Sequence, residues 1–265
     1  MLDISHVSKS FNLGTPVQKD ALKDISLYLN EGDFVTVIGG NGAGKSTMLN
    51  AIAGVFPVDD GCVKIDGNDV TKDPEYKRAK YIGRVFQDPL RGTAGDMWIE
   101  ENLAFALRRG KKRNFKWGIS NKEREMFVEL LKTLDLGLET RLNAKVGLLS
   151  GGQRQALTLL MATIKKPQIL LLDEHTAALD PKTAQKVLDI TNKVVTENNL
   201  TTIMITHNMK DAIKYGNRLI MMHEGRIIYD IAGEEKAKLN VSDLLEKFEV
   251  ASDGEFANDR MMLAR

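Results

Sequence analysis

The segment Gly39–Thr47, GGNGAGKST, combines glycines with a lysine and hydroxyl side chains. Glycines allow backbone conformations in which successive N–H groups point inward and surround an anion. Positions 39–46 fit the pattern G-x-x-x-x-G-K-[ST], in which Lys45 reaches the β- and γ-phosphates and Ser46 binds Mg²⁺. The alternative, an ordinary glycine-rich turn before a helix, does not account for the Lys-Ser pair. The predicted nucleotide-binding residues are Gly39, Gly40, Asn41, Gly42, Ala43, Gly44, Lys45, Ser46 and Thr47.

The elements on either side of this loop support the same interpretation. Phe34–Ile38, FVTVI, is a short apolar run that predicts a buried strand. We expect a helix from Lys45 to about Ala53, with Gly54 as the stop signal just past its end. The positive end of that helix dipole adds to the attraction for a phosphate group.

A second group of candidate residues stands at the end of the segment Ile169–Glu174, ILLLDE, in which an apolar run is followed by two acids. We expect a strand over Gln168–Asp173, and ligands bind at the carboxyl edge of parallel sheets. Asp173 is suited to the Mg²⁺ shell and Glu174 to the general base that polarises the attacking water. An apolar strand that ends in two acids is common, so this assignment depends on the phosphate loop beside it.

The first half of the chain carries two further kinds of pattern. Ile25–Leu29 alternates and Val63–Ile65 precedes an Asp-Gly turn, which predicts a small antiparallel sheet at the N-terminal side. Ile99–Leu107 has helical spacing, and Ser120 with Glu123 forms a capping-box pattern before an apolar stripe. Residues 88–150 are therefore predicted to form a helical lobe.

Strand and helix patterns that are typical of a parallel α/β sheet lie on both sides of this lobe. Asp180 and Pro181 are expected at the start of a helix, as N-cap and first helical residue. The further predicted strands are Tyr81–Phe86, Thr201–Thr206 and a hairpin of Leu219–Met222 and Arg226–Tyr229. We predict one domain over residues 1–249, with a core of 1–87 and 151–249, the lobe at 88–150 and a tail at 250–265.

Composition narrows the classes of partner. Of the 265 residues, 43% are hydrophobic and 28% are charged, which is typical of a globular protein. The net charge of +1 gives no global field that would attract nucleic acid. A single cysteine, Cys62, leaves no intrachain disulfide, and the N-terminus MLDISHVSKS lacks a secretory signal. No apolar run approaches the roughly 20 residues that span a bilayer, so we expect any membrane role to be peripheral.

The segment Leu149–Gln155, LSGGQRQ, indicates the protein family that the chain resembles. With it, the chain resembles the ATP-binding cassette (ABC) family in its transporter branch, over Val7 to about Tyr229. The resemblance implies an α/β fold with a P-loop NTPase core, a mainly parallel sheet, an N-terminal antiparallel β-subdomain and an inserted helical lobe. The motifs occur in the family's order: phosphate loop, Gln87 in VFQDP, LSGGQ, ILLLDE, Ala178-Leu179-Asp180, and His207 in ITH.

The resemblance implies roles for residues outside the phosphate loop. Phe11 resembles the aromatic residue that stacks on adenine, with a core phenylalanine as the alternative. Gln87 resembles the glutamine that touches Mg²⁺ or water and reports to the partner protein. His207 resembles the switch histidine that holds the γ-phosphate, with a purely structural histidine as the alternative.

The LSGGQ segment, referred to below as the signature, is expected to act on the ATP bound by a second subunit. Ser150, Gly151, Gly152 and Gln153 resemble the segment that closes on that nucleotide's γ-phosphate. Ser150 would also cap a helix through about Ile164, which accounts for the serine but not for the two glycines. Asp180 resembles the acid that couples the two sites, with simple N-capping as the alternative.

These roles imply a head-to-tail dimer, with C2 symmetry in a homodimer, around two ATP–Mg²⁺. The resemblance further implies transmembrane permease subunits, an extracellular solute-binding protein, and a cytoplasmic position on the inner face of the cell membrane. The stretch RGTAGDMWIEENLAFAL resembles cassettes of bacterial solute importers, which favours amino acids, including aromatic ones, as cargo. We expect no nucleic-acid partner.

Most ABC ATPases with non-transport functions have features that this sequence lacks. ABC ATPases of DNA repair or chromosome structure insert long coiled coils, whereas about a hundred residues separate the loop from the signature here. Translation factors carry two cassettes in one chain, and this sequence shows one. LSGGQ and ITH argue against a kinase. A cytosolic assembly-factor ATPase of similar size remains an open alternative.

Two features depart from the family pattern or lie outside it. His175 stands where a proline usually follows the Asp-Glu pair, which alters the turn because proline fixes φ; a catalytic role for it is not expected. The basic stretch Arg108–Lys116 either meets lipid headgroups or an acidic partner loop, or forms a solvated tip of the lobe, which is the favoured interpretation.

Overall fold

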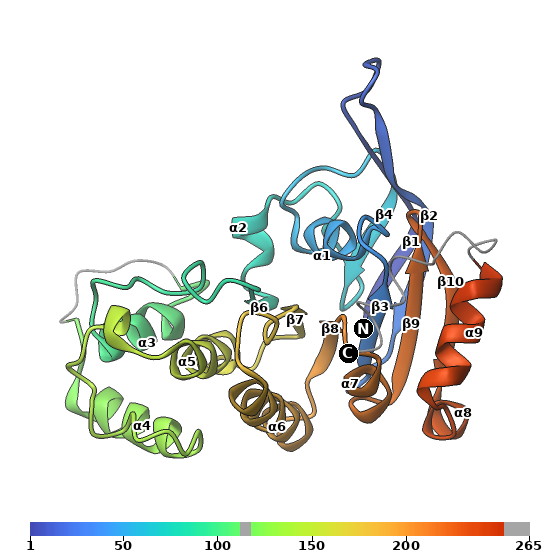
Figure 1. Ribbon diagram of the computed structural model, residues 1–265. Helices are drawn as coiled ribbons and strands as arrows, with labels where there is room; N and C mark the ends of the chain where they lie inside the picture. Colours follow the sequence, from blue (N-terminus) through green and yellow to red (C-terminus); the bar gives the residue numbers. More distant parts are fainter. Residues whose placement is uncertain (112–117, 252–265) are drawn as a thin grey trace.

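The computed structural model describes residues 1–111 and 118–251, and Figure 1 shows their arrangement. The strands among them, in chain order, are β1 Leu2–Phe11, β2 Lys19–Leu29, β3 Phe34–Gly39, β4 Asp60–Ile65, β5 Asn68–Asp69, β6 Ile82–Val85, β7 Ile169–Asp173, β8 Thr201–Ile205, β9 Arg218–His223 and β10 Arg226–Ala232. The helices are α1 Lys45–Ala53, α2 Glu75–Arg78, α3 Ile99–Leu107, α4 Asn121–Lys132, the 3₁₀ turn η1 Val146–Leu148, α5 Gly151–Thr163, α6 Pro181–Glu197, α7 Met209–Lys214, α8 Gly233–Ala237 and α9 Val241–Ala251.

The larger sheet has the strand order β10-β9-β3-β8-β7-β6. All neighbouring strands from β9 to β6 are parallel, and β10 runs antiparallel to β9, so the predicted mainly parallel sheet with a closing hairpin is confirmed. The register pairs Ile205 with both Val37 and Asp173. The carboxyl ends of β3, β7 and β8 therefore meet at one edge, where parallel sheets bind their ligands.

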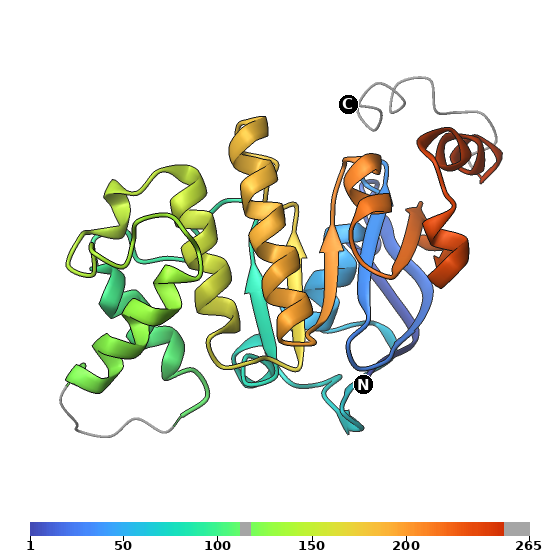
Figure 2. The same cartoon turned by 90° about the horizontal axis from the view of Figure 1, so that it is seen from below.

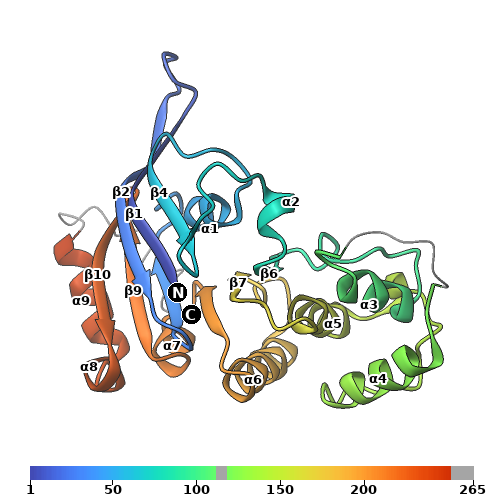
Figure 3. The same cartoon turned by 180° about the vertical axis from the view of Figure 1, so that it is seen from behind.

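The smaller sheet, of order β2-β1-β4-β5, is antiparallel, as predicted for the N-terminal side (Figure 3). Its long strand β1 was not predicted. The apolar residues Leu2, Ile4 and Val7 do not alternate strictly, because the register shifts between Ile4 and Val7 and His6 has a φ of 55°. A β-bulge thus hides the two-residue period by which strands are usually found in a sequence.

The lobe and the larger sheet share one hydrophobic cluster. It contains Leu103 of α3, Phe127 of α4, Leu157 and Leu160 of α5, and Leu172 of β7. The helices α5 and α6 lie side by side against the strands, as seen from below in Figure 2. The predicted capping box of Ser120 and Glu123 is confirmed at the start of α4. The lobe is therefore packed directly on the sheet that carries the carboxyl edge.

The C-terminal helices α8 and α9 were not predicted. Leu244 and Phe248 of α9 are buried in a cluster with Met209 of α7 and Met221 of β9. The predicted tail overlaps the end of α9, which reaches Ala251, and residues 252–265 lie outside the described part. None of the helices in residues 1–111 and 118–251 is both long and apolar enough to cross a bilayer.

Candidate nucleotide-binding site

The glycines of the phosphate loop allow β3 to turn into α1 against two other strands. Gly44 caps α1 with a φ of 100°, and a Cβ atom on it would lie 2.6 Å from the carbonyl oxygen of Ala21. A Cβ atom on Gly39 would lie 2.2 Å from the carbonyl oxygen of Met222. Helix α1 spans Lys45–Ala53 and ends at Gly54, as predicted. The loop conformation therefore depends on glycine at these close approaches.

Lys45 is 5% exposed, and its Nζ atom donates hydrogen bonds to the carbonyl oxygens of Gly39 (2.7 Å) and Gly40 (2.9 Å). A buried ammonium is stable only where such acceptors or counter-charges surround it. Lys45 is therefore held at the phosphate loop with its positive charge available to an anion that the loop surrounds.

Two of the three residues predicted at the magnesium ion, Ser46 and Asp173, come together. The hydroxyl of Ser46 donates a hydrogen bond of 3.0 Å to Oδ1 of Asp173. Burial raises the pKa of Asp173, while the hydroxyl of Ser46 and the charge of Arg84 act in the opposite direction. Mg²⁺ is commonly held by one or two protein oxygen ligands together with substrate phosphates and water, and this pair of oxygen donors fits it.

Arg84 of β6 was missed by sequence reasoning and lies beside Asp173. Its Nη2 atom is 3.9 Å from Oδ2 of Asp173 and donates a 2.5 Å hydrogen bond to Oδ1 of Asn50 in α1. Its guanidinium also lies 4.5 Å from the ring centroid of Phe86. The only sequence signal is a charged residue inside an apolar strand. Arg84 thus connects β6 and α1 to the carboxylate at the end of β7.

The side chains of Glu174 and His207 lie within hydrogen-bond distance, with 2.5 Å between Oε1 and Nε2. Glu174 adopts the left-handed conformation, with a φ of 47°. Burial raises the pKa of Glu174, but the hydrogen bond from His207 and the charges of His207 and Lys45 outweigh burial, so its pKa is lowered. The carboxylate is therefore ionised at neutral pH, as a group that accepts a proton must be.

A cavity of about 250 Å³ joins the loop to the N-terminal sheet. Phe11, at the end of β1, forms one wall, and its ring meets Phe56 edge to face at a centroid distance of 5.2 Å. This position suits a stacked base, although part of the ring is already covered. The lining residues are Phe11, Lys19, Ala21, Asn41, Gly42, Ala43, Gly44, Lys45, Ser46, Thr47 and Glu174.

The signature residues lie at the start of α5, and none of them lines this cavity. Ser150 caps α5: its Oγ accepts from the backbone N–H of Gln153 (3.3 Å), whose Oε1 accepts from the N–H of Ser150 (3.2 Å). A Cβ atom on Gly152 would lie 2.1 Å from Cγ2 of Thr183 in α6. Capping thus accounts for Ser150, and close packing on α6 accounts for Gly152.

The last two predicted site residues, Asp180 and Gln87, lie at the start of a helix and just after a strand. Asp180 caps α6 by accepting from the N–H of Thr183 (3.1 Å), and the side-chain hydrogen bond with Thr183 lowers its pKa. Gln87 is exposed and follows β6. The preceding carbonyl, of Phe86, accepts a hydrogen bond of 3.1 Å from the buried Gln155 of α5. The end of β6 is therefore attached to the signature helix.

The chain matches the ABC transporter family model over residues 22–177. The chain belongs to this family. It is 45% identical to a tyrosine transport ATP-binding protein of Clostridioides difficile over 251 residues, 95% of this chain and 100% of the relative. It is 32% identical to an energy-coupling factor transporter ATP-binding protein of Acetivibrio thermocellus over 242 residues, 90% of this chain and 82% of the relative.

A solved structure of similar fold is the ABC cassette described as a dimer in a post-hydrolysis state with ADP and phosphate. It has a TM-score of 0.74 and 30% identity, and covers 88% of this chain and 98% of its own. The predicted α/β fold of a P-loop NTPase is thereby confirmed. This cassette is the ATP-binding subunit of an ABC transporter and couples ATP hydrolysis to transport.

His175, where the family usually has proline, is buried in this cassette (2% exposed). Its Nε2 atom lies 3.0 Å from Oγ1 of Thr191, whose own hydroxyl donates to the carbonyl of Val187 (2.8 Å). Nε2 is therefore the protonated ring nitrogen that donates to Thr191. Burial lowers the pKa of His175 to about 4. These contacts support a structural role for His175, which attaches the turn after β7 to α6.

The basic stretch of the cassette is described only up to Lys111, and residues 112–116 lie outside the described part. Arg108 pairs with Glu123 (3.1 Å), and Arg109 donates to the carbonyl oxygen of Ala162 (3.0 Å). Lys165 in turn donates to the carbonyl oxygen of Arg109 (2.6 Å). Arg108 is therefore bonded within the lobe and Arg109 to α5 and the residue Lys165 that follows it, whereas Gly110 and Lys111 are exposed.

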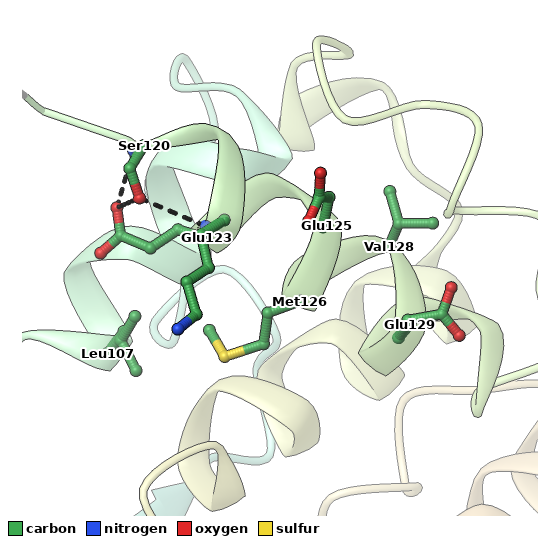
Figure 4. A pocket seen from close by; sticks show the side chains of 8 residues that line it. Leu107, Ser120, Glu123, Glu125, Met126, Val128 and Glu129 are labelled. Atoms are coloured by element: carbon green, nitrogen blue, oxygen red, sulfur yellow. Dashed lines mark hydrogen bonds between the residues drawn. The ribbon is translucent and has the colours of Figure 1, made fainter.

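A larger hollow of about 620 Å³ lies on the lobe, and Figure 4 shows side chains that line it. None of its lining residues belongs to the phosphate loop. Three of its lining residues are acidic, one is basic and none belongs to a glycine-rich turn, so it is less suited to phosphate than the loop. Its lining residues are Leu107, Ser120, Lys122, Glu123, Glu125, Met126, Val128 and Glu129. The smaller cavity at the phosphate loop remains the candidate nucleotide site.

Proposed function

We propose that this cassette pairs head to tail with a second cassette around two ATP–Mg²⁺ and drives solute import through separate membrane permeases. The observation that supports the hydrolytic site is the meeting of a buried lysine and two side-chain pairs at one sheet edge. Lys45 is held at the loop, Ser46 touches Asp173, and Glu174 pairs with His207. These groups supply a cation for phosphate, oxygen ligands for a metal, and a base.

The chain's own residues divide the hydrolytic step among them. The loop N–H groups and Lys45 hold the β- and γ-phosphates, and Ser46 and Asp173 hold Mg²⁺, which neutralises charge on those phosphates when bound. Glu174 orients the attacking water and accepts its proton as oxygen bonds to the γ-phosphorus and the bond to ADP breaks. In this proposal His207 orients Glu174 and reaches the γ-phosphate, and Gln87 approaches the metal.

The dimer is inferred from the separation of the signature from the cavity. Ser150 and Gly151 are exposed and lie outside the cavity lining of their own chain. We infer that Ser150, Gly151, Gly152 and Gln153 face the γ-phosphate bound by the other subunit, with Asp180 beside them. The similar cassette solved as a dimer with ADP and phosphate supports this arrangement.

The solute class is proposed from the relatives. The C. difficile relative is named for tyrosine transport, and a Lactobacillus delbrueckii relative that is 33% identical is named for methionine import. We propose an amino acid or similar small solute, a solute-binding protein in the same system, and a position on the inner face of the cell membrane. Exposed Leu90, Trp98 and Phe105 supply apolar surface for a permease.

The test compares ATPase activity and oligomeric state of the wild type and Glu174→Gln, with and without ATP–Mg²⁺. We expect hydrolysis to fall by about 100-fold or more, while the variant forms an ATP-dependent dimer. Glu197→Gln, an exposed acid at the end of α6, is the control and should behave as wild type. If Glu174→Gln hydrolyses ATP at the wild-type rate, Glu174 is not the general base.

A second experiment tests the import proposal. The cassette is purified from its host membranes with any permease that it retains, reconstituted in proteoliposomes, and assayed for ATP-dependent uptake of tyrosine, methionine and spermidine. We expect amino-acid uptake to exceed spermidine uptake. If no permease co-purifies and the cassette still hydrolyses ATP, the result would favour the alternative of a cytosolic assembly-factor ATPase.

A further inference from the structure

Lys19 lies over the phosphate loop, although it belongs to no motif of the sequence. It is directly opposite Phe11 in the antiparallel pair of β1 and β2, and both side chains line the nucleotide cavity. Its Nζ atom lies 3.1 Å from the position that a Cβ atom on Gly42 would occupy. Two residues further along β2, the carbonyl of Ala21 touches Gly44. The backbone of β2 therefore holds Lys19 in register with the loop.

The ammonium of Lys19 has no hydrogen-bond or ion-pair partner within residues 1–111 and 118–251. The adjacent carboxylate of Asp20 accepts from Ser10 (2.8 Å). The nearby Lys9, by contrast, is paired with Asp59 at 2.7 Å. An unpaired cation beside a loop that binds anions increases the positive potential of the cavity, and a bound phosphate would supply the missing counter-charge.

We propose that Lys19 binds the α-phosphate of the nucleotide. This inference rests on the proposed function, in which Phe11 stacks on the base and Lys45 reaches the β- and γ-phosphates. The ribose and α-phosphate then lie between these two ends of the cavity, and Lys19 stands there, opposite the ring and over Gly42. Because ATP and ADP share the α-phosphate, this contact retains both nucleotides and does not distinguish them.

The test measures the Kd of ATP, ADP and adenosine by calorimetry in Mg²⁺ buffer for the wild type, Lys19→Gln and Lys19→Arg. We expect Lys19→Gln to raise the Kd of ATP and of ADP alike by about five- to tenfold, the size of a charge-assisted hydrogen bond made by an exposed side chain. Adenosine binding should not change. Lys19→Arg should keep most of the affinity, because it keeps the charge.

Lys23→Gln is the matched control. Lys23 lies on the same strand and lines an adjacent hollow, but not the nucleotide cavity. Its removal lowers the net charge by the same amount and should leave both Kd values within twofold of wild type. An equal loss in Lys23→Gln would mean that general charge, and not a contact of Lys19, attracts the nucleotide, and this would overturn the proposal.

Two other outcomes separate this inference from the proposed function. If Lys19→Gln binds ATP and ADP as wild type does while Lys45→Ala loses both, the loop binds nucleotide and the Lys19 proposal is wrong. If Lys19→Gln weakens ATP alone, Lys19 acts on the γ-phosphate and the proposal is also wrong. If Lys45→Ala binds as wild type does, the nucleotide site itself is misassigned.

Discussion

Helices α4 and α5 begin with the same pair of reciprocal hydrogen bonds. In α4, Ser120 Oγ accepts from the N–H of Glu123 (3.3 Å), and the Glu123 carboxylate accepts from the N–H of Ser120 (2.8 Å). In α5, Ser150 and Gln153 repeat the arrangement at 3.3 and 3.2 Å. The two starts differ in charge, because the third residue is a carboxylate in α4 and a neutral amide in α5.

That difference decides what each helix start can bind. The N-terminus of a helix carries about half a positive charge. In α4 the carboxylate of Glu123 neutralises it, and Arg108 pairs with the same carboxylate. In α5 the first turn contains no acid, and Arg154 adds a positive charge one residue later. The positive partial charge at the start of α4 is therefore neutralised within the chain. The start of α5 keeps its partial charge and can bind an anion from outside its own chain.

The largest effect is expected from exchanging this one group. Gln153→Glu keeps the capping box but places a carboxylate where the γ-phosphate of the other subunit would approach. We expect hydrolysis to fall by about 100-fold, because the charge repels that phosphate. Stability should fall by about 1 kcal/mol, because a carboxylate cannot donate the 3.3 Å hydrogen bond that Nε2 of Gln153 donates to the carbonyl oxygen of Leu136. ATPase assays and chemical denaturation measure the two effects.

The reciprocal variant Glu123→Gln in α4 serves as the control. It should lower stability by about 0.5–1 kcal/mol, through the lost helix-dipole interaction, and leave hydrolysis unchanged. Unchanged hydrolysis in Gln153→Glu would show that the start of α5 meets no phosphate, and the contrast between the two helices would then have no functional meaning.

A smaller effect is expected from Gly152→Ala, which tests why α5 begins with glycines. Its Cβ atom would lie 2.1 Å from Cγ2 of Thr183, so we expect a loss of about 1–3 kcal/mol and about tenfold slower hydrolysis. Adding Thr183→Ser removes the clashing methyl group and should restore stability but not hydrolysis. If the double variant recovers both, Gly152 serves only the packing of α5 on α6.

The smallest effect on activity is expected at His175, which lies outside both helix starts. Burial lowers its pKa to about 4 from 6.5, so the unfolded chain binds the proton more readily than the native protein. Stability is complete above pH 6.5 and is lost as the pH falls towards 4, by roughly 3 kcal/mol. Denaturation curves across this range should show the loss in the wild type and not in His175→Asn.

At neutral pH, His175→Asn should hydrolyse ATP within twofold of the wild type, because the ring contacts Thr191 and not the nucleotide cavity. A large loss of turnover with unchanged stability would mean that this histidine takes part in the chemistry. In that case the departure from the usual proline would be functional and not merely a different anchor for the turn.

The local parts of the site were predictable because each depends on neighbours in the sequence. The strand before the loop, the helix Lys45–Ala53 with its stop at Gly54, and the caps at Ser150 and Asp180 all lie where the pattern placed them. For the helix and the two caps, the bonds that define the element join residues a few positions apart. The strand β3 pairs with the distant strands β8 and β9, but its continuous apolar run marks it as a buried strand. The exception is β1, where the bulge at His6 breaks the alternation on which such a prediction depends.

The sequence by itself determined the family, the phosphate loop and the order of the motifs, because these depend on residue type and short spacing. Tertiary structure alone decided that Arg84 lies beside Asp173, that Lys19 stands over Gly42, and that Thr183 leaves room only for glycine at 152. Such contacts join residues that are far apart in the chain. Their geometry follows from how strands and helices pack, and no local pattern carries that information.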